Sequence, residues 1–265
     1  MTLILSGDIT LRRTWQPMDP DVAAYITAVE TADGQALEEP VKIAIDNFVL
    51  GCKADGIWDA IKASCILAGA RTLNGALQPL VGTAPTNFNF VAGDYDRKTG
   101  LKGDRNTKYL DSGRNNNADP QDSSSMAAYV EELPTTGAPS FLLGSNNVAP
   151  GATCIGYNTD ISVFYRNRNS DAQLDSQIDV NGGFIGMSRS LSTEYVARYQ
   201  GANTTYTKTS QTPSSQNVAV FTEAEGLSFK SNARLAFYSI GESLDLALLD
   251  ARVTDLINKF AEVIP

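Results

Sequence analysis

Hydrophobic residues in the first third of the chain recur at the spacing of an amphipathic helix. Asp19 followed by Pro20 is a typical helix start, with a capping carboxylate and a proline at the first helical position. Gly34 is a typical helix end, because glycine adopts the left-handed conformation of a C-cap without strain. One helical face between them carries Val22, Tyr25, Ile26 and Val29. The pattern predicts a helix over this segment.

Two further segments repeat this spacing. Pro40 begins the first, whose apolar face consists of Val41, Ala44, Ile45, Phe48 and Cys52. We predict another helix from about Ile57 to Gly69. Its apolar face would consist of Ile61, Cys65 and Ala68. A helical unit this small buries little apolar surface by itself, so we expect it to pack against the next domain or against another subunit.

From Thr83 onward the hydrophobic period changes to two, which is typical of strands. The predicted strands are Phe88–Val91, Lys108–Asp111, Ser125–Val130, Ser140–Leu143, Cys154–Tyr157, Ile161–Arg166, Gly183–Met187, Tyr195–Tyr199, Asn217–Thr222 and Leu235–Ile240. The connectors are rich in Asn, Ser, Thr, Gly and Asp, which favour turns. Many short strands at even spacing indicate an antiparallel sandwich or jelly roll, although the pattern alone does not exclude a barrel.

The chain ends on a predicted helix, with Ser243 as its N-cap and Asp245 in the first turn. Its apolar positions follow a heptad spacing: Leu246, Leu249, Val253, Leu256, Phe260 and Val263. The repeat lasts only about two and a half heptads, which is short for a coiled coil. The helix therefore either packs back on the chain or meets symmetry mates in a homotrimer. In the second case Leu249, Val253, Leu256, Phe260 and Trp58 would form the subunit contacts.

Composition excludes several classes of function. The chain has 265 residues, 42% of them hydrophobic, and a net charge of −9 with no basic stripe, so a nucleic-acid-binding role is not expected. It contains no histidine, which excludes imidazole-activated nucleophiles and histidine-ligated metals. No apolar run reaches the roughly 18 residues of a membrane span, and the N-terminus does not resemble a signal peptide. The three cysteines, Cys52, Cys65 and Cys154, are an odd and sparse set, as expected of a protein made in a reducing cytosol. Cys52 and Cys65 lie on predicted apolar helical faces and are interpreted as small buried hydrophobes.

Two groups of polar residues are candidates for ligand binding. Asp94 and Asp96 offer oxygen ligands, so Ca²⁺ is possible, although the loop fails the EF-hand template and is also read as a solvated loop. Amides, arginines and a tyrosine in the strand connectors combine the residue types of a sugar-binding surface. These glycan-binding candidates are Arg114, Asn115, Asn117, Tyr157, Asn158, Arg166 and Arg168. The alternative is that asparagine-rich loops are simply turns.

Three phrases of the chain carry a resemblance to a known family. They are GCKADGIWDAIKASCILAGARTL (51–73), PTNFNFVAGDYDRKTGLKGD (85–104) and RLAFYSIGESLDLALLDARVTDLINKF (234–260). The chain from about Asp19 onward resembles the laminin-G-like, concanavalin A-like jelly-roll structural proteins of tailed bacteriophages. The resemblance implies a mainly β fold with a helical attachment segment at 1–81, a jelly-roll sandwich at 82–242 and a C-terminal helix at 243–265.

The same resemblance implies a non-enzymatic component of the virion. The jelly roll would serve as a tail fibre or a tail-associated protein that contacts the host. Its expected partners are other virion proteins and a candidate host-surface glycan. One alternative is a head-decoration protein that stabilises the capsid. The other is a polysaccharide depolymerase, which needs two carboxylates facing one cleft. Glucanases of this fold carry a Glu-x-Asp-x-x-Glu strand motif that is missing here, and Glu223 with Glu225 is the nearest approximation.

Overall fold

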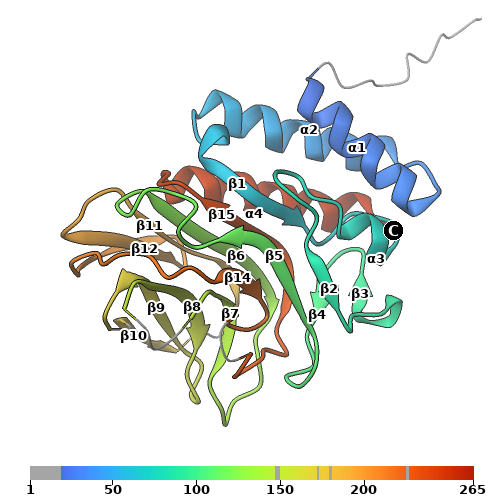
Figure 1. Cartoon of the computed structure of the whole chain (residues 1–265). Helices are drawn as coiled ribbons and strands as arrows, with labels where there is room; N and C mark the ends of the chain where they lie inside the picture. The colour runs from blue at the N-terminus through green and yellow to red at the C-terminus, as the bar shows by residue number, and fades with distance from the viewer. Residues whose placement is uncertain (1–18, 147–149, 172, 179–180, 225–226) are drawn as a thin grey trace, which may run out of the picture.

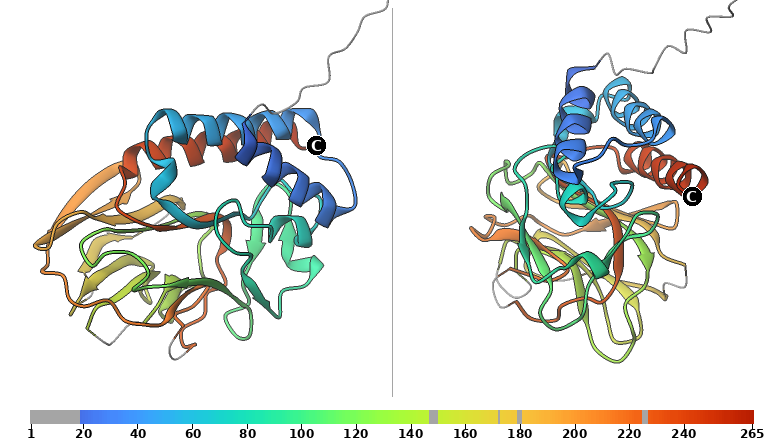
Figure 2. Two further views of the ribbon diagram at one scale, coloured as in Figure 1. Left: turned by 45° about the horizontal axis from the view of Figure 1, so that its top comes forward. Right: turned by 90° about the vertical axis from the view of Figure 1, so that its right-hand side faces the viewer.

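The computed structural model describes residues 19–146, 150–171, 173–178, 181–224 and 227–265. Within these residues the chain forms three layers, which are a set of helices and two antiparallel sheets (Figure 1). The helices lie on one side of the first sheet, and the second sheet packs against its other side (Figure 2). This arrangement confirms the predicted antiparallel jelly-roll sandwich with its N-terminal and C-terminal helices.

The first sheet, called sheet A, has the strand order β13-β12-β11-β6-β15-β4-β3, and β1 pairs with β15 beside this path. Its strands are β1 (Ile61–Ile66), β3 (Tyr95–Asp96), β4 (Gly100–Lys102), β6 (Ser124–Glu132), β11 (Gly183–Arg189), β12 (Glu194–Tyr199), β13 (Ala202–Thr207) and β15 (Arg234–Gly241).

The second sheet, called sheet B, has the order β10-β9-β8-β7-β14-β5-β2. Its strands are β2 (Thr86–Phe88), β5 (Tyr109–Asn115), β7 (Ser140–Gly144), β8 (Ala152–Tyr157), β9 (Ser162–Asn169), β10 (Gln173–Ile178) and β14 (Asn217–Val220). Both orders mix strands that are distant in sequence, so the sandwich forms only when long-range pairs come together.

Alternating side chains of the two sheets meet in a common core. Met126 and Ile185 of sheet A and Ile155 and Val163 of sheet B all lie in this core and are at most 1% exposed. Burial of apolar surface from both sheets stabilises the sandwich, since each strand contributes every second residue to the interior.

The helical layer consists of α1 (Pro20–Asp33), α2 (Glu39–Ala54), the short α3 (Leu73–Ala76) and α4 (Leu246–Val263). Asp19 caps α1 by accepting the Asp21 N–H at 3.0 Å, and Gly34 ends it with φ of 64°. The first two predicted helices are therefore confirmed. The fourth helix begins after Asp245, which caps it by accepting the Ala247 N–H at 2.8 Å, so the predicted N-cap Ser243 is wrong. No helix of the described residues is both long and apolar enough to cross a membrane.

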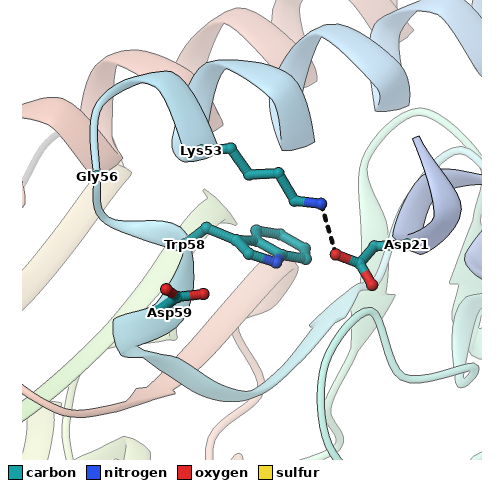
Figure 3. Close-up of a pocket in the computed structure, with 5 residues that line it drawn as sticks. All are labelled: Asp21, Lys53, Gly56, Trp58 and Asp59. Carbon is teal, nitrogen blue, oxygen red and sulfur yellow. Dashed lines mark hydrogen bonds and ion pairs between the residues drawn. The ribbon is translucent and has the colours of Figure 1, made fainter. Parts of the chain in front are cut away.

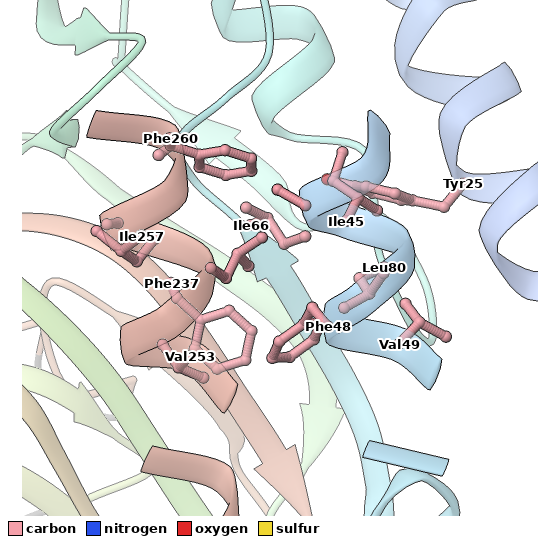
Figure 4. Close-up of a cluster of buried hydrophobic side chains, with 14 of the residues drawn as sticks. Tyr25, Ile45, Phe48, Val49, Ile66, Leu80, Phe237, Val253, Ile257 and Phe260 are labelled. Atoms are coloured by element: carbon pink, nitrogen blue, oxygen red, sulfur yellow. The ribbon is translucent and has the colours of Figure 1, made fainter. Parts of the chain in front are cut away.

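A second core joins the helices to the outer face of sheet A. The rings of Phe48 on α2 and Phe237 on β15 meet edge to face with centroids 5.8 Å apart, and Phe260 of α4 completes the cluster (Figure 4). Helices α2 and α4 run side by side over the sheet (Figure 2). The helical segment thus shares one core with the sandwich, because its apolar faces cover the sheet.

This packing corrects the predicted subunit contacts on the last helix. Leu249, Val253, Leu256 and Phe260 are at most 1% exposed within the single chain, because α4 turns them toward α2 and sheet A. They are not available for a threefold seam. The helix packs back on the chain, which was the first of the two predicted alternatives.

The predicted helix from Ile57 to Gly69 is also wrong. A 3₁₀ turn, η1 (Trp58–Ala60), leads into strand β1, which pairs antiparallel with β15. Ile61 and Ile66 face the helices, whereas Ala63 and Cys65 face the core between the sheets. Ile61, Ala63 and Cys65 alternate with Lys62 and Ser64, as in a strand. Ile61, Cys65 and Ala68 also recur at helical spacing, so this short segment fits both structures.

Candidate functional site

A surface hollow of about 330 Å³ lies where α1, α2 and η1 meet. It is lined by Asp21, Lys53, Gly56, Trp58 and Asp59 (Figure 3). Gly56 has φ of 71°, a conformation that suits glycine and turns the chain from the end of α2 into η1. This turn places the half-buried Trp58 ring beside the last turn of α2.

The Lys53 ammonium crosses the hollow and is held by two carboxylates. Its Nζ lies 5.5 Å from the centre of the Trp58 ring and donates to Asp19 Oδ1 at 2.8 Å and to Asp21 Oδ2 at 2.5 Å. The hydrogen bond with Asp19 raises the pKa of Lys53 and lowers the pKa of Asp19. The group over the ring is therefore a charged ammonium fixed in place by its partners.

The composition of this hollow suits a hydroxylated ligand. An indole ring offers an apolar face for a sugar ring, carboxylates accept hydrogen bonds from hydroxyls, and an ammonium donates them. The volume lies at the lower end of the range of about 300–1,000 Å³ that is common for small-ligand sites. Trp58 was predicted as a subunit contact. In the single chain it lies half-buried on this partly open surface, and the subunit contact stays a prediction.

Arg168 is a predicted glycan-binding residue that lies in the interior. Its side chain is 2% exposed and donates to the backbone carbonyls of Pro120, Gln121 and Asn116, the last at 2.6 Å. Burial lowers its pKa to about 10. The guanidinium thus fastens the loop after β5 to β9, and a role as a surface ligand for sugars is not compatible with this burial.

Arg114, Asn115 and Asn117 surround the same loop. Arg114 forms an ion pair with the buried Asp119, and Asn115 donates to the Ser215 carbonyl. Asn117 is exposed. With Arg168 these residues gather at one end of the sandwich, but Asn117 alone presents a largely free side chain there.

Tyr157 and Asn158 lie at the opposite end of the β8–β9 hairpin. Tyr157 is 1% exposed in the core between the sheets, so its ring cannot stack on a sugar in this structure. Asn158 donates to Ser162 Oγ at 3.1 Å within the hairpin turn. Arg166, in the middle of β9, is 8% exposed. The seven predicted residues therefore do not form one site.

The possible calcium ligands are engaged by the protein itself. Asp94 pairs with Lys108 Nζ at 2.6 Å and accepts the Val91 N–H. Asp96 accepts the N–H groups of Lys98 and Thr99, both at 2.9 Å. Over the part of the chain that the structure describes, no group of three or more acidic or cysteine side chains is placed to hold a metal ion. These carboxylates act as loop caps, which agrees with the solvated-loop alternative.

Of the two carboxylates considered for hydrolysis, Glu223 alone lies in the described residues. Glu223 is 3% exposed and accepts the Ser228 N–H at 3.0 Å, whereas Glu225 lies outside the described residues. Burial raises the pKa of Glu131 and Asp46, as a general acid requires, but neither residue lines the Trp58 hollow.

Solved structures with a similar fold include a sialidase and a toxin domain. The Trypanosoma rangeli sialidase in complex with sialic acid has a TM-score of 0.52 at 10% identity over 75% of this chain and 33% of that chain. The botulinum neurotoxin serotype D binding domain has a TM-score of 0.51 at 9% identity over 74% of this chain and 51% of that chain. No protein-family model matches the chain, and no curated protein matches it.

These comparisons define the class of fold. At about 10% identity the likeness shows the fold alone, an antiparallel β-sandwich of the jelly-roll type. The chain spans about a third to a half of the length of the structures it matches, so their activities are not carried over to it.

The sequence contains a partial signal for the Trp58 hollow. Seven consecutive residues contain four that line the hollow: Lys53, Gly56, Trp58 and Asp59. A tryptophan flanked by charged residues and glycine indicates a binding surface. Asp21 could not be found in this way, because it reaches the hollow only through the packing of α1 beside the end of α2.

Proposed function

We propose that this protein is a non-enzymatic structural subunit of a tailed-bacteriophage virion, a tail fibre or tail-associated protein, and that its Trp58 hollow binds a glycan of the host surface. The three phage-like phrases of the sequence support the virion assignment. The sandwich is compatible with the glycan, since the similar sialidase structure is a complex with sialic acid.

The observation that carries the proposal is the lining of the hollow. Trp58 supplies a partly exposed indole, Asp59 is an exposed carboxylate, and Lys53 is an ammonium held in place by Asp19 and Asp21. An aromatic ring bordered by fixed polar groups is a common arrangement for binding a sugar ring.

The non-enzymatic part of the proposal rests on the acids at this site. Hydrolysis by a carboxylate pair requires one acid with a raised pKa and a second carboxylate at a defined separation, about 5–5.5 Å for retention and wider for inversion. Asp21 forms an ion pair with Lys53 at 2.5 Å, so its carboxylate is engaged by a cation of the chain itself. The hollow is therefore better suited to binding than to proton transfer.

In the assembled virion we expect a homotrimer whose contacts use surfaces other than the buried face of α4. Light scattering of the purified protein at micromolar concentration tests this state, and a monomer throughout would contradict it.

An array of bacterial surface polysaccharides tests the proposed function directly. Labelled protein should bind at least one glycan saturably without releasing reducing ends, and Trp58→Ala should lose that binding. Leu191→Ala is the matched control, because Leu191 is 53% exposed and lies outside the hollow. Binding to purified capsids without any glycan binding would instead favour head decoration. Release of reducing ends would favour the depolymerase.

A further inference from the structure

The Lys53 ammonium in the Trp58 hollow directs its hydrogen-bond donors at the chain itself. Its Nζ lies 2.8 Å from both carboxylate oxygens of Asp19 and 2.5 Å from Oδ2 of Asp21. A lysine ammonium has three N–H donors, which equals the number of these contacts. A ligand in the hollow therefore meets Lys53 as a fixed charge whose donors are already engaged.

The carboxylates that line the hollow are less fully engaged. Asp59 is exposed, and its carboxylate forms no hydrogen bond or ion pair with any described residue. Asp21 is also exposed, and its hydrogen bond with Lys53 uses Oδ2 and leaves Oδ1 without this donor. The charged groups that a ligand can reach are therefore carboxylate oxygens, which accept hydrogen bonds and donate none (Figure 3). The indole N–H of Trp58 can donate, but it carries no charge.

The net charge at the hollow is negative. Three carboxylates, those of Asp19, Asp21 and Asp59, lie around the single ammonium of Lys53. Carboxylates of one sign around a concave surface attract cations and repel anions. An acidic sugar would therefore meet repulsion at the hollow and find no charged donor for its carboxylate.

Cations of the neighbouring segments do not offset this excess of negative charge. Arg252 of α4 forms an ion pair with Asp55, just after α2, at 2.7 Å. Lys62 of β1 forms an ion pair with Glu242 at 3.0 Å. Each of these positive charges is matched by a carboxylate of its own, so the hollow keeps its negative charge.

The Trp58 ring determines where a ligand cation can lie. The Lys53 ammonium already lies over this ring, 5.5 Å from its centre, so the cation–π position on that face is occupied. Asp59 follows Trp58 on the same 3₁₀ turn, and its carboxylate borders the same hollow (Figure 3). A sugar ring that contacts Trp58 can thus place a charged substituent at Asp59.

We propose that the Trp58 hollow selects an amino sugar with a free ammonium group, which pairs with Asp59 while the sugar ring contacts Trp58. This inference rests on the proposed glycan contact and adds the charge of the glycan to it. A neutral sugar would share the ring contact and lack the ion pair. An exposed ion pair increases affinity by up to about fivefold.

Nuclear magnetic resonance of the ¹⁵N-labelled full chain tests this selection at slightly acidic pH, where the sugar amine is protonated. The indole N–H signal of Trp58 is the one that remains in Trp15→Phe. It should move saturably with D-glucosamine, which should bind about three- to fivefold more tightly than D-glucose or N-acetyl-D-glucosamine. D-glucuronate should bind more weakly than D-glucose. Added salt should reduce the preference for glucosamine, because it screens exposed charges.

Asp59→Asn keeps the size of the side chain and removes its charge. This variant should bind glucosamine only about as tightly as glucose, and its glucose affinity should equal that of the wild type. Glu39→Gln is the matched control and should keep the preference. Glu39 is an exposed acid in the first turn of α2, whereas the hollow lies beside the last turn of this helix.

Three results would overturn this inference while the glycan contact itself stands. They are equal affinities for glucosamine and glucose, tighter binding of glucuronate than of glucosamine, and an unchanged preference in Asp59→Asn. A Trp58 signal that none of these sugars moves would overturn it as well. Binding on the glycan array, and its loss in Trp58→Ala, would then show separately whether the proposed function stands.

Discussion

The ring of Phe260 on α4 lies directly on the backbone of Gly69. A Cβ built on Gly69 would come within 2.7 Å of two ring carbons, and Gly69 has φ of 85°. The glycine therefore allows the last helix to approach the segment that follows β1. This contact is one reason why the apolar face of α4 is covered within the chain.

We expect substitution at either residue to destabilise the monomer fold. Phe260→Ala should lower the free energy of unfolding by about 3–5 kcal/mol, because a fully buried aromatic ring is removed. Gly69→Ala should cost about 2 kcal/mol or more, from the left-handed backbone and the clash with the ring. Urea unfolding monitored by circular dichroism measures both effects.

The exposed Lys259→Ala is the control for these two variants and should change little. The double variant Phe260→Ala, Gly69→Ala should cost less than the sum of the two, since the ring that clashes is gone. A cost of the double variant equal to the sum of the two single costs would contradict a direct contact between the ring and the glycine.

Arg168 is expected to hold the loop after β5 in place. Arg168→Ala would leave the carbonyls of Asn116, Pro120 and Gln121 without their donor, and each buried unsatisfied acceptor costs about 1–3 kcal/mol. We expect faster amide hydrogen exchange in 116–123 and a lower melting temperature. Arg105→Ala, at an arginine that binds only exposed loop groups, should be much milder. Equal effects of both variants would show that burial of Arg168 adds nothing.

Acid should weaken the contact between the Glu38 carboxylate and Arg97. Arg97 donates to both Glu38 oxygens, at 3.2 and 2.8 Å, and this hydrogen bonding lowers the pKa of Glu38. Because the pKa of Glu38 is lower in the folded state, the contact stabilises the protein at pH values above the unfolded-state pKa of about 4.3. This stabilisation is lost as the pH falls through the folded-state pKa. The gap in melting temperature between wild type and Glu38→Gln should therefore shrink from pH 6 to pH 3. The gain stays below about 1 kcal/mol because the pair is partly exposed. A gap that does not change with pH would refute this assignment.

The fold could be predicted where one face of an element is polar. The helices at Pro20–Asp33 and Glu39–Ala54 show a clear helical stripe, and most strands of the sandwich alternate. The exception is Ile61–Ile66, a run of six residues that alternates as a strand does. Ile61 and Cys65 also continue to Ala68 at helical spacing, so the pattern alone does not decide between strand and helix.

The sites were harder to predict because burial depends on distant partners. Arg168 and Tyr157 have the residue types of a sugar-binding surface, but strand pairing places one under the loop 116–123 and the other between the sheets. Asp21 and Trp58 are far apart in sequence and meet only through helix packing. Residue type indicates possible chemistry, whereas exposure follows from the long-range fold.

Trp58 offers the most direct test of the central claim, which is glycan binding without hydrolysis. The chain has two tryptophans, Trp15 and Trp58, so Trp15→Phe leaves Trp58 as the only indole reporter. Fluorescence of this variant should change saturably when a polysaccharide identified on the array is titrated, and the polysaccharide should be recovered at full length. An unchanged Trp58 signal at saturating polysaccharide, or shortening of the chains, would contradict the account.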